Sequence, residues 1–124
     1  MSRVWLVLPT VLLAAGCGDE VHARWEERAP LPSCGAVDFD QGETLRRDAP
    51  DELACLREAL TSGKGAELQV TSPTVEGDPV TVYYRVTPEG TTEIYEDTTE
   101  DAYGSDEWSY ASCGRPASVL DVNC

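Results

Sequence analysis

Alternation of apolar and polar residues is the clearest pattern in the chain. Residues 66–71 alternate Ala, Leu and Val with Glu, Gln and Thr, and residues 80–87 are rich in β-branched and aromatic side chains. Breakers between them at residues 72–79 indicate a loop. Pro88-Glu89-Gly90 is typical of a tight connection, after which residues 91–97 return as a partner strand. The pattern predicts consecutive antiparallel strands.

The register of the last two strands follows from their side chains. If Thr87 lies opposite Thr91, the facing pairs are Arg85 with Glu93, Tyr83 with Tyr95, and Tyr84 with Ile94. Such pairs are worth about 0.2–1 kcal/mol each, and a slip of one residue would lose them all. Tyr84 and Ile94 are therefore predicted to face a helix, and the other four side chains to face away from it.

A helical period precedes the strands. Asp48 is a candidate N-cap and Pro50 a first-turn residue, and Gly63 is a natural helix end. Three leucines fall on one face between them, at Leu53, Leu56 and Leu60. We predict one main helix over this stretch.

The C-terminal part adds two shorter signals. Residues 107–113 favour a further strand with Trp108 and Tyr110 pointing inward, and the last stretch carries the short apolar pair Val119 and Leu120. The predicted fold class is α+β, with one main helix packed on a three- to four-stranded antiparallel meander.

The N-terminal segment resembles a bacterial export signal. Arg3 precedes an apolar run over residues 4–13, and Ala14-Ala15-Gly16 then leads to Cys17. Small residues before a cysteine are typical of a lipobox, in which the thiol becomes a diacylglyceryl thioether and the preceding residues are removed. The commonest lipobox has Leu where this chain has Ala14. The apolar run is shorter than the roughly 20 residues that span a bilayer. A soluble secreted protein and an uncleaved anchor remain alternatives.

Cysteine counting favours lipidation. The chain has five cysteines, and lipidation of Cys17 leaves an even set, as expected for an exported domain with two disulfides. We predict the pairs Cys34–Cys55 and Cys113–Cys124, one of three possible connectivities.

Three regions follow from this reading: a signal peptide at 1–16, a lipidated cysteine and tether at 17–33, and a disulfide-bonded domain at 34–124. Within the tether, residues 21–28 fit either a short helix with Trp25 on one side or a disordered spacer, of which we favour the spacer. Pro30 and Pro32 would stiffen its end nearest the domain.

Charge limits the partners. The formal net charge is −14, which argues against nucleic acid and would attract a cationic protein. Six acids lie within residues 96–107, but their spacing does not match a calcium loop. A solvated acidic loop, or a weak non-specific cation site, is the expectation.

Enzymatic signatures are missing from the sequence. His22 is the only histidine and lies in the predicted tether, so a Ser-His-Asp triad or a Cys₂His₂ zinc site is excluded from the predicted domain. No C-x-x-C pair or phosphate-binding glycine loop occurs. We expect no cofactor, no metal and no catalytic residues. Tyr83, Tyr95 and Tyr103 either form an exposed aromatic patch for binding or simply cover the outer face of the sheet.

Several stretches together resemble the small lipoproteins common in actinobacteria. They are Asp40-Gln41-Gly42-Glu43, Ala54-Cys55-Leu56, Glu76-Gly77-Asp78-Pro79, Tyr83-Tyr84-Arg85-Val86, and a late acidic loop that ends near Trp108 before a cysteine. The resemblance covers most of the predicted domain and implies no activity, because the family has no established one.

The sequence therefore predicts a non-enzymatic lipoprotein on the extracytoplasmic face of the cell membrane, acting as a small binding or accessory module. One alternative is an acidic inhibitor or ligand of a cationic extracellular protein, such as a cell-wall hydrolase. A second is a small hydrolase that uses two carboxylates.

Overall fold

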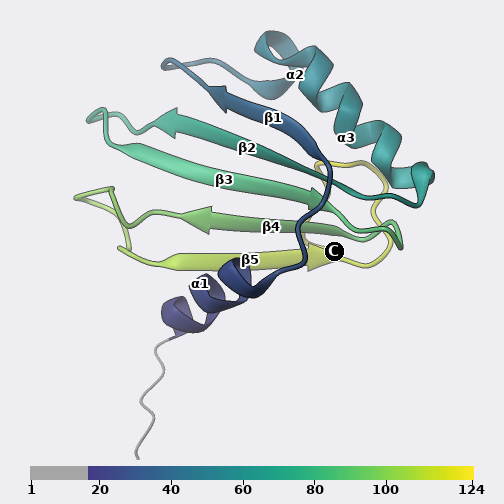
Figure 1. Ribbon diagram of the computed structural model, residues 1–124. Coiled ribbons are helices and arrows are strands. Elements are labelled where there is room, and N and C mark those ends of the chain that lie inside the picture. The colour runs from purple at the N-terminus through teal and green to yellow at the C-terminus, as the bar shows by residue number, and fades with distance from the viewer. Residues whose placement is uncertain (1–16) are drawn as a thin grey trace, which may run out of the picture.

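The computed structural model describes residues 17–124. The predicted signal peptide at residues 1–16 lies outside the described residues, as does the side chain of Cys17. The elements, in chain order, are α1 (Cys17–Glu27), β1 (Ser33–Asp38), α2 (Leu45–Asp48), α3 (Pro50–Ser62), β2 (Ala66–Pro73), β3 (Pro79–Val86), β4 (Thr92–Asp97) and β5 (Trp108–Cys113). They form one sheet with helices on both of its faces (Figure 1).

The sheet has five strands in the order β1-β2-β3-β4-β5. Strands β2 to β5 pair antiparallel, and β1 pairs parallel with β2. The α+β class and the antiparallel part are as predicted, but the sheet is mixed and five-stranded rather than a three- to four-stranded meander. Strand β1 was missed because Ser-Cys-Gly-Ala-Val-Asp has no regular alternation and only one β-branched residue, Val37. Its parallel pairing is possible because α2 and α3 cross between β1 and β2.

The predicted hairpin register is confirmed. Tyr83 pairs with Tyr95, Arg85 with Glu93, and Tyr84 with Ile94. The Thr87 amide donates to the Thr91 carbonyl at 2.9 Å, which closes the hairpin where the sequence placed it. One face of the sheet therefore carries Tyr84 and Ile94, and the opposite face carries Tyr83 and Tyr95.

Helix α3 begins at Pro50 and ends before Gly63, which adopts the left-handed conformation at φ 73°. The predicted N-cap is wrong. Asp48 belongs to α2, and its carboxylate accepts from the Thr44 amide at 2.7 Å. This hydrogen bond, together with one from Arg47, lowers the pKa of Asp48. Ala49 holds the N-cap position of α3 without a side-chain bond.

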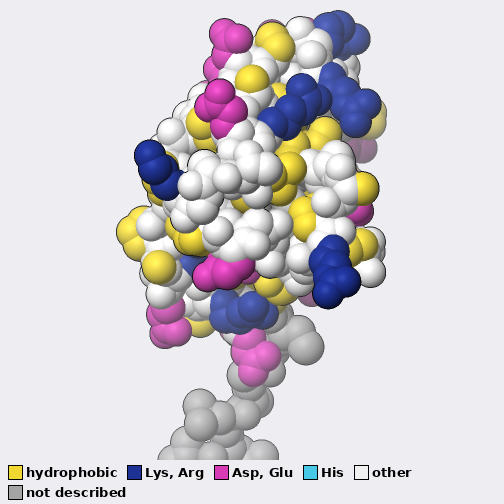
Figure 2. Space-filling view, turned by 90° about the vertical axis from the view of Figure 1, so that its right-hand side faces the viewer, with side chains coloured by type: hydrophobic (Ala, Val, Ile, Leu, Met, Phe, Trp, Pro, Cys, Tyr) yellow, Lys and Arg dark blue, Asp and Glu magenta, His cyan; other side chains and the backbone are white. Residues whose placement is uncertain are grey.

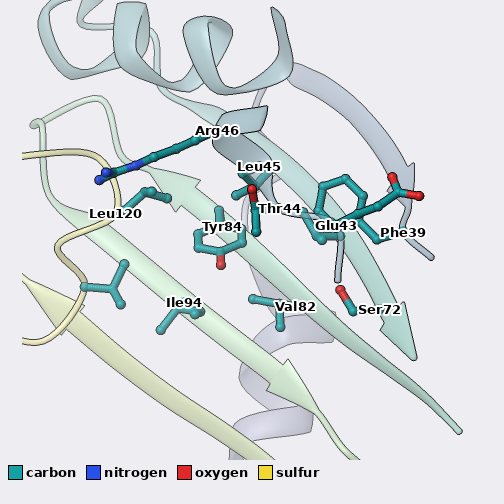
Figure 3. Close-up of a pocket in the computed structure, with 12 residues that line it drawn as sticks. Phe39, Glu43, Thr44, Leu45, Arg46, Ser72, Val82, Tyr84, Ile94 and Leu120 are labelled. Atoms are coloured by element: carbon teal, nitrogen blue, oxygen red, sulfur yellow. The ribbon is translucent and has the colours of Figure 1, made fainter. Parts of the chain in front are cut away.

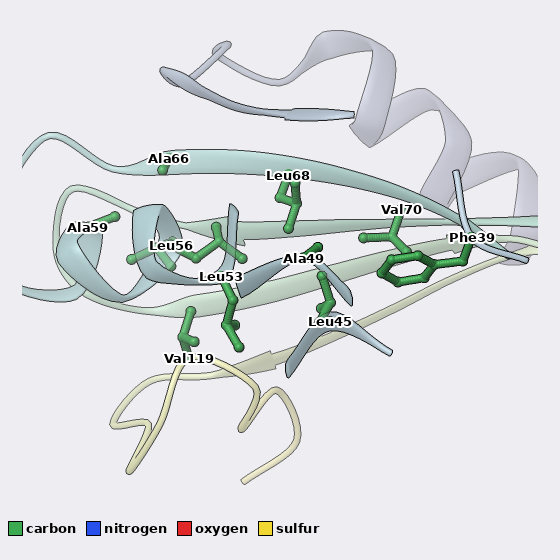
Figure 4. Packing of buried hydrophobic residues seen from close by; sticks show 11 residues of the cluster. Phe39, Leu45, Ala49, Leu53, Leu56, Ala59, Ala66, Leu68, Val70 and Val119 are labelled. Atoms are coloured by element: carbon green, nitrogen blue, oxygen red, sulfur yellow. The ribbon is translucent and has the colours of Figure 1, made fainter. Parts of the chain in front are cut away.

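The aliphatic core lies between α3 and the sheet (Figure 4). Leu53 and Leu56 are 1% and 0% exposed, whereas Leu60 is only partly buried at its edge. The other core residues are Phe39, Leu45, Ala49, Ala59, Ala66, Leu68, Val70, Val86 and Val119. Val119 shows that the tail after β5 folds back into the core.

Both predicted disulfides are present. Cys34–Cys55 joins β1 to α3, and Cys113–Cys124 joins the end of β5 to the end of the chain. The buried Thr92 side chain donates to the Asp121 carbonyl at 2.5 Å. This hydrogen bond holds the tail to β4 at a residue that lies between the two cysteines of the second disulfide.

Residues 17–27 form helix α1, so the disordered spacer that we favoured is wrong. The helix packs on β5, on the face of the sheet opposite α3 (Figure 1). Trp108 and Tyr110 point toward α1 and not toward α3, because Tyr110 pairs with Tyr95 on the outer face. The prediction that these two aromatic side chains point inward, toward the face that α3 covers, is therefore wrong.

Candidate functional site

A groove opens on the α3 face of the sheet. Helix α3 covers only part of this face, and the space between α2, strands β2 to β4 and the tail is left as a cavity of about 480 Å³. Most of its lining is apolar, and the residues are Phe39, Glu43, Thr44, Leu45, Arg46, Val70, Ser72, Val82, Tyr84, Ile94, Leu120 and Val122. Its volume lies within the roughly 300–1,000 Å³ of typical ligand pockets.

Three ionisable side chains interrupt the apolar lining (Figure 3). Arg46 extends from α2 toward Leu120, whereas Glu43 lies at the opposite end beside Phe39. The Tyr84 side chain stands on the floor of the groove between them. Burial, and then the nearby charge of Glu96, raise the pKa of the Tyr84 hydroxyl. This hydroxyl is therefore a hydrogen-bond donor at neutral pH inside an apolar groove.

An aromatic layer fills the space between α1 and the sheet. The Trp25 ring lies 4.0 Å from the Tyr83 ring and 5.2 Å from the Tyr95 ring, between centroids. His22 stacks on Trp108 at 4.5 Å. Offset and tilted rings at these separations attract each other beyond their buried area. The helix is thus docked on the sheet by aromatic contacts.

The three tyrosines that the sequence singled out are not brought together as one exposed patch. Tyr95 is 3% exposed and Tyr83 lies against Trp25. Tyr103 is 79% exposed, in the loop between β4 and β5. Sequence reasoning missed the contact of Trp25 with the sheet. Its signal was the spacing of His22 and Trp25, three residues apart and therefore on one helix face.

Ion pairs extend the aromatic layer toward β1. Arg85 is 7% exposed and donates to Glu93 at 2.7 Å and to the Ala29 carbonyl at 2.9 Å. The Glu67 carboxylate accepts a hydrogen bond from Arg28 Nε at 2.8 Å and another from the Leu31 amide. The connection from α1 to β1 is therefore fixed to the sheet by charge-assisted hydrogen bonds, which are among the stronger ones in proteins.

A second, acidic hollow of about 470 Å³ lies between the start of α1 and the β4–β5 loop. Its acidic lining residues are Asp19, Asp97, Asp106 and Glu107. Among the described residues, one group of three has ligand atoms close enough for a metal ion, namely Cys113, Asp121 and Cys124. Two of these are the sulfurs of a disulfide, so the geometry gives no support to a metal centre.

Comparison of the chain with models of protein families, with curated proteins and with solved structures finds no match. Across residues 17–124, none of the helices has the length and apolar character needed to cross a membrane. The fold and site define an α+β domain with an apolar groove on one face of the sheet and a docked N-terminal helix on the other.

Proposed function

We propose that the protein is a lipoprotein anchored to the extracytoplasmic face of the cell membrane through Cys17, and that its domain is a non-enzymatic binding module. The anchor is supported by the pairing of the cysteines. Two disulfides take four of the five, and the one left over stands directly after Ala14-Ala15-Gly16.

The groove supports the binding module. Its lining includes a single carboxylate, Glu43, and neither histidine nor cysteine among the described residues. A mostly apolar groove with a few polar groups is typical of a binding site for a largely apolar ligand. The Tyr84 hydroxyl and the Arg46 guanidinium would orient a polar end of the ligand.

The anchor is tested by Cys17→Ala in the native host. We expect the wild-type protein in the membrane fraction with a diacylglyceryl group on residue 17 by mass spectrometry, and the variant in the soluble fraction. Wild-type protein that begins at residue 17 without lipid would contradict the anchor.

The groove is tested with an anilinonaphthalene sulfonate dye, which fluoresces in apolar surroundings. Val82→Asp places a charge on the groove floor, and we expect it to weaken dye binding at least tenfold. Val75→Asp is the matched control, since Val75 is 89% exposed and lies outside the groove. Equal binding by both variants, with both folded by circular dichroism, would contradict a ligand site here.

A cationic protein partner is a second candidate function. Glu100, Asp106 and Glu107 are exposed in the β4–β5 loop, and like-signed charges on one loop attract a basic surface at long range. Capture of a basic partner that is lost at about 1 M salt, where the Debye length falls to about 3 Å, would support this function. Capture unchanged by Glu100→Gln, Asp106→Asn and Glu107→Gln together would contradict it.

A further inference from the structure

Two exposed hydrophobic side chains lie at one end of the sheet. Val75 is 89% exposed and Tyr103 is 79% exposed. Val75 lies in the β2–β3 loop and Tyr103 in the β4–β5 loop, and the two loops touch, because the Ala102 amide donates to the Asp78 carboxylate at 3.0 Å. These loops lie together at the left of Figure 1.

Helix α1 begins at the same end. A methyl group added at Gly18 would lie 3.1 Å from Cβ of Glu107, so the first turn of α1 packs closely on the β4–β5 loop. His22, one turn later, stacks on Trp108 at the start of β5. Cys17 is therefore next to the end of the sheet that carries Val75 and Tyr103.

No flexible linker separates the start of α1 from the rest of the domain. A disordered segment of residues 17–33 would let the domain stand off by as much as about 50 Å. Instead, α1 is docked by His22 on Trp108 and by Trp25 on Tyr83. Arg28, which directly follows the helix, pairs with Glu67. The backbone at the start of α1 is therefore held beside the β4–β5 loop.

We propose that this end of the sheet, formed by the β2–β3 and β4–β5 loops and called the anchor end here, rests on the lipid surface. The inference depends on the proposed lipid at Cys17. A diacylglyceryl group places the Cys17 sulfur at the depth of the headgroups, and the docked helix then brings Tyr103 and Val75 to the same level. Exposed tyrosine is favoured at this depth, where its ring contacts lipid and its hydroxyl contacts water.

Charge decides which lipid surface is suitable. The anchor end carries the exposed acids Glu76, Glu100, Asp106 and Glu107. The opposite side of the molecule, which faces the viewer in Figure 2, presents Lys and Arg side chains interspersed with acids. Anionic headgroups repel the acids within a Debye length. A zwitterionic surface fits this end, and an anionic one fits it only when salt screens the repulsion.

The test uses the mature lipidated protein, beginning at Cys17, in phosphatidylcholine vesicles. Val75→Cys and Tyr103→Cys each add one thiol for a nitrobenzoxadiazole label, and Glu89→Cys is the matched control, since Glu89 lies in the β3–β4 turn at the opposite end of the sheet. Spin-labelled headgroup lipids then quench the fluorescence of nearby labels. We expect quenching at positions 75 and 103 to exceed that at position 89 at least threefold.

Further variants separate the contact from the anchor. Trp25→Ala removes the central aromatic contact of α1, and we expect quenching at position 103 to fall at least twofold while the protein remains on the vesicles; Trp25→Phe should retain it. Phosphatidylglycerol should lower the quenching at position 103, and salt should restore it. Equal quenching at all three positions on bound protein would overturn this inference alone, whereas unbound protein would overturn the anchor and the inference together.

Discussion

The two faces of the sheet are covered by helices of different kinds. Helix α3 buries aliphatic side chains, with Leu56 0% exposed, and is cross-linked to β1 by Cys34–Cys55. Helix α1 contacts its face through Trp25 and His22, which are themselves partly exposed, and through the ion pair of Arg28. Burial of aliphatic surface supports the whole fold, whereas a helix held by surface aromatic rings and ion pairs can open locally without unfolding the rest.

The largest effect is expected on the α3 face. Leu56→Ala should lower the free energy of unfolding by about 3–5 kcal/mol, because it removes buried methyl groups and leaves a cavity. Arg57→Ala, on the exposed side of the same helix, should change it by less than about 0.5 kcal/mol. Urea denaturation measures both. A loss at Leu56 no larger than at Arg57 would contradict the assignment of the core.

Removal of the cross-link on the same face comes next. Cys34→Ser with Cys55→Ser frees a loop whose ends are 21 residues apart, at a cost of about 3 kcal/mol by the chain-entropy estimate. We expect thermal unfolding to move to lower temperature as a single transition, since β1 and α3 belong to one core. An unchanged melting temperature would show that the disulfide adds nothing to stability.

A smaller and local effect is expected on the α1 face. Trp25→Ala should weaken docking of α1 by about 2 kcal/mol, from the lost ring contacts, while the melting temperature of the sheet changes little. Proteolysis should then cut within residues 17–32 of the variant and spare those of Trp25→Phe. Global unfolding as severe as that of Leu56→Ala would remove the distinction between the two faces.

The smallest effect concerns pH. Burial, followed by the charge of Glu93, raises the pKa of Tyr95. The unfolded chain therefore loses the tyrosine proton before the folded one does, and stability falls as pH rises above about 10, the usual pKa of tyrosine. Tyr95→Phe should reduce this alkaline loss, measured by urea denaturation across that pH range. Tyr103→Phe is the exposed control, and equal curves for the two variants would contradict a buried Tyr95.

The parts of the fold that the sequence predicted correctly are those with a regular alternation of apolar and polar residues. Alternation located β2, β3 and β4. The pairing of Arg85 with Glu93 set the register of β3 with β4, because the side chains of both strands must agree on one face. Strand β1 was missed because a disulfide and a parallel neighbour hold it, and neither leaves a periodic signal. Trp108 and Tyr110 were assigned to the wrong face, since aromatic alternation gives the period of a strand and not the identity of the layer that covers it.

The candidate site was less accessible from sequence. The cysteine pairs followed from counting and spacing, but the groove depends on where the tail crosses the sheet, and its lining residues Val82 and Leu120 come from distant segments. The anchor end depends on docking of α1, which tertiary contacts of Trp25 decide. A short polar helix has little intrinsic stability in water, so the sequence alone favoured a spacer.

Hydrogen exchange of the α1 amides tests most directly whether the N-terminal helix is part of the folded domain. The account predicts that backbone amides of residues 21–25 exchange at least tenfold more slowly than the corresponding free peptide, and that Trp25→Ala abolishes this protection while amides of α3 keep theirs. Exchange of residues 21–25 at the rate of the free peptide in the wild-type protein would contradict docking of α1, and with it the contact of the anchor end with lipid.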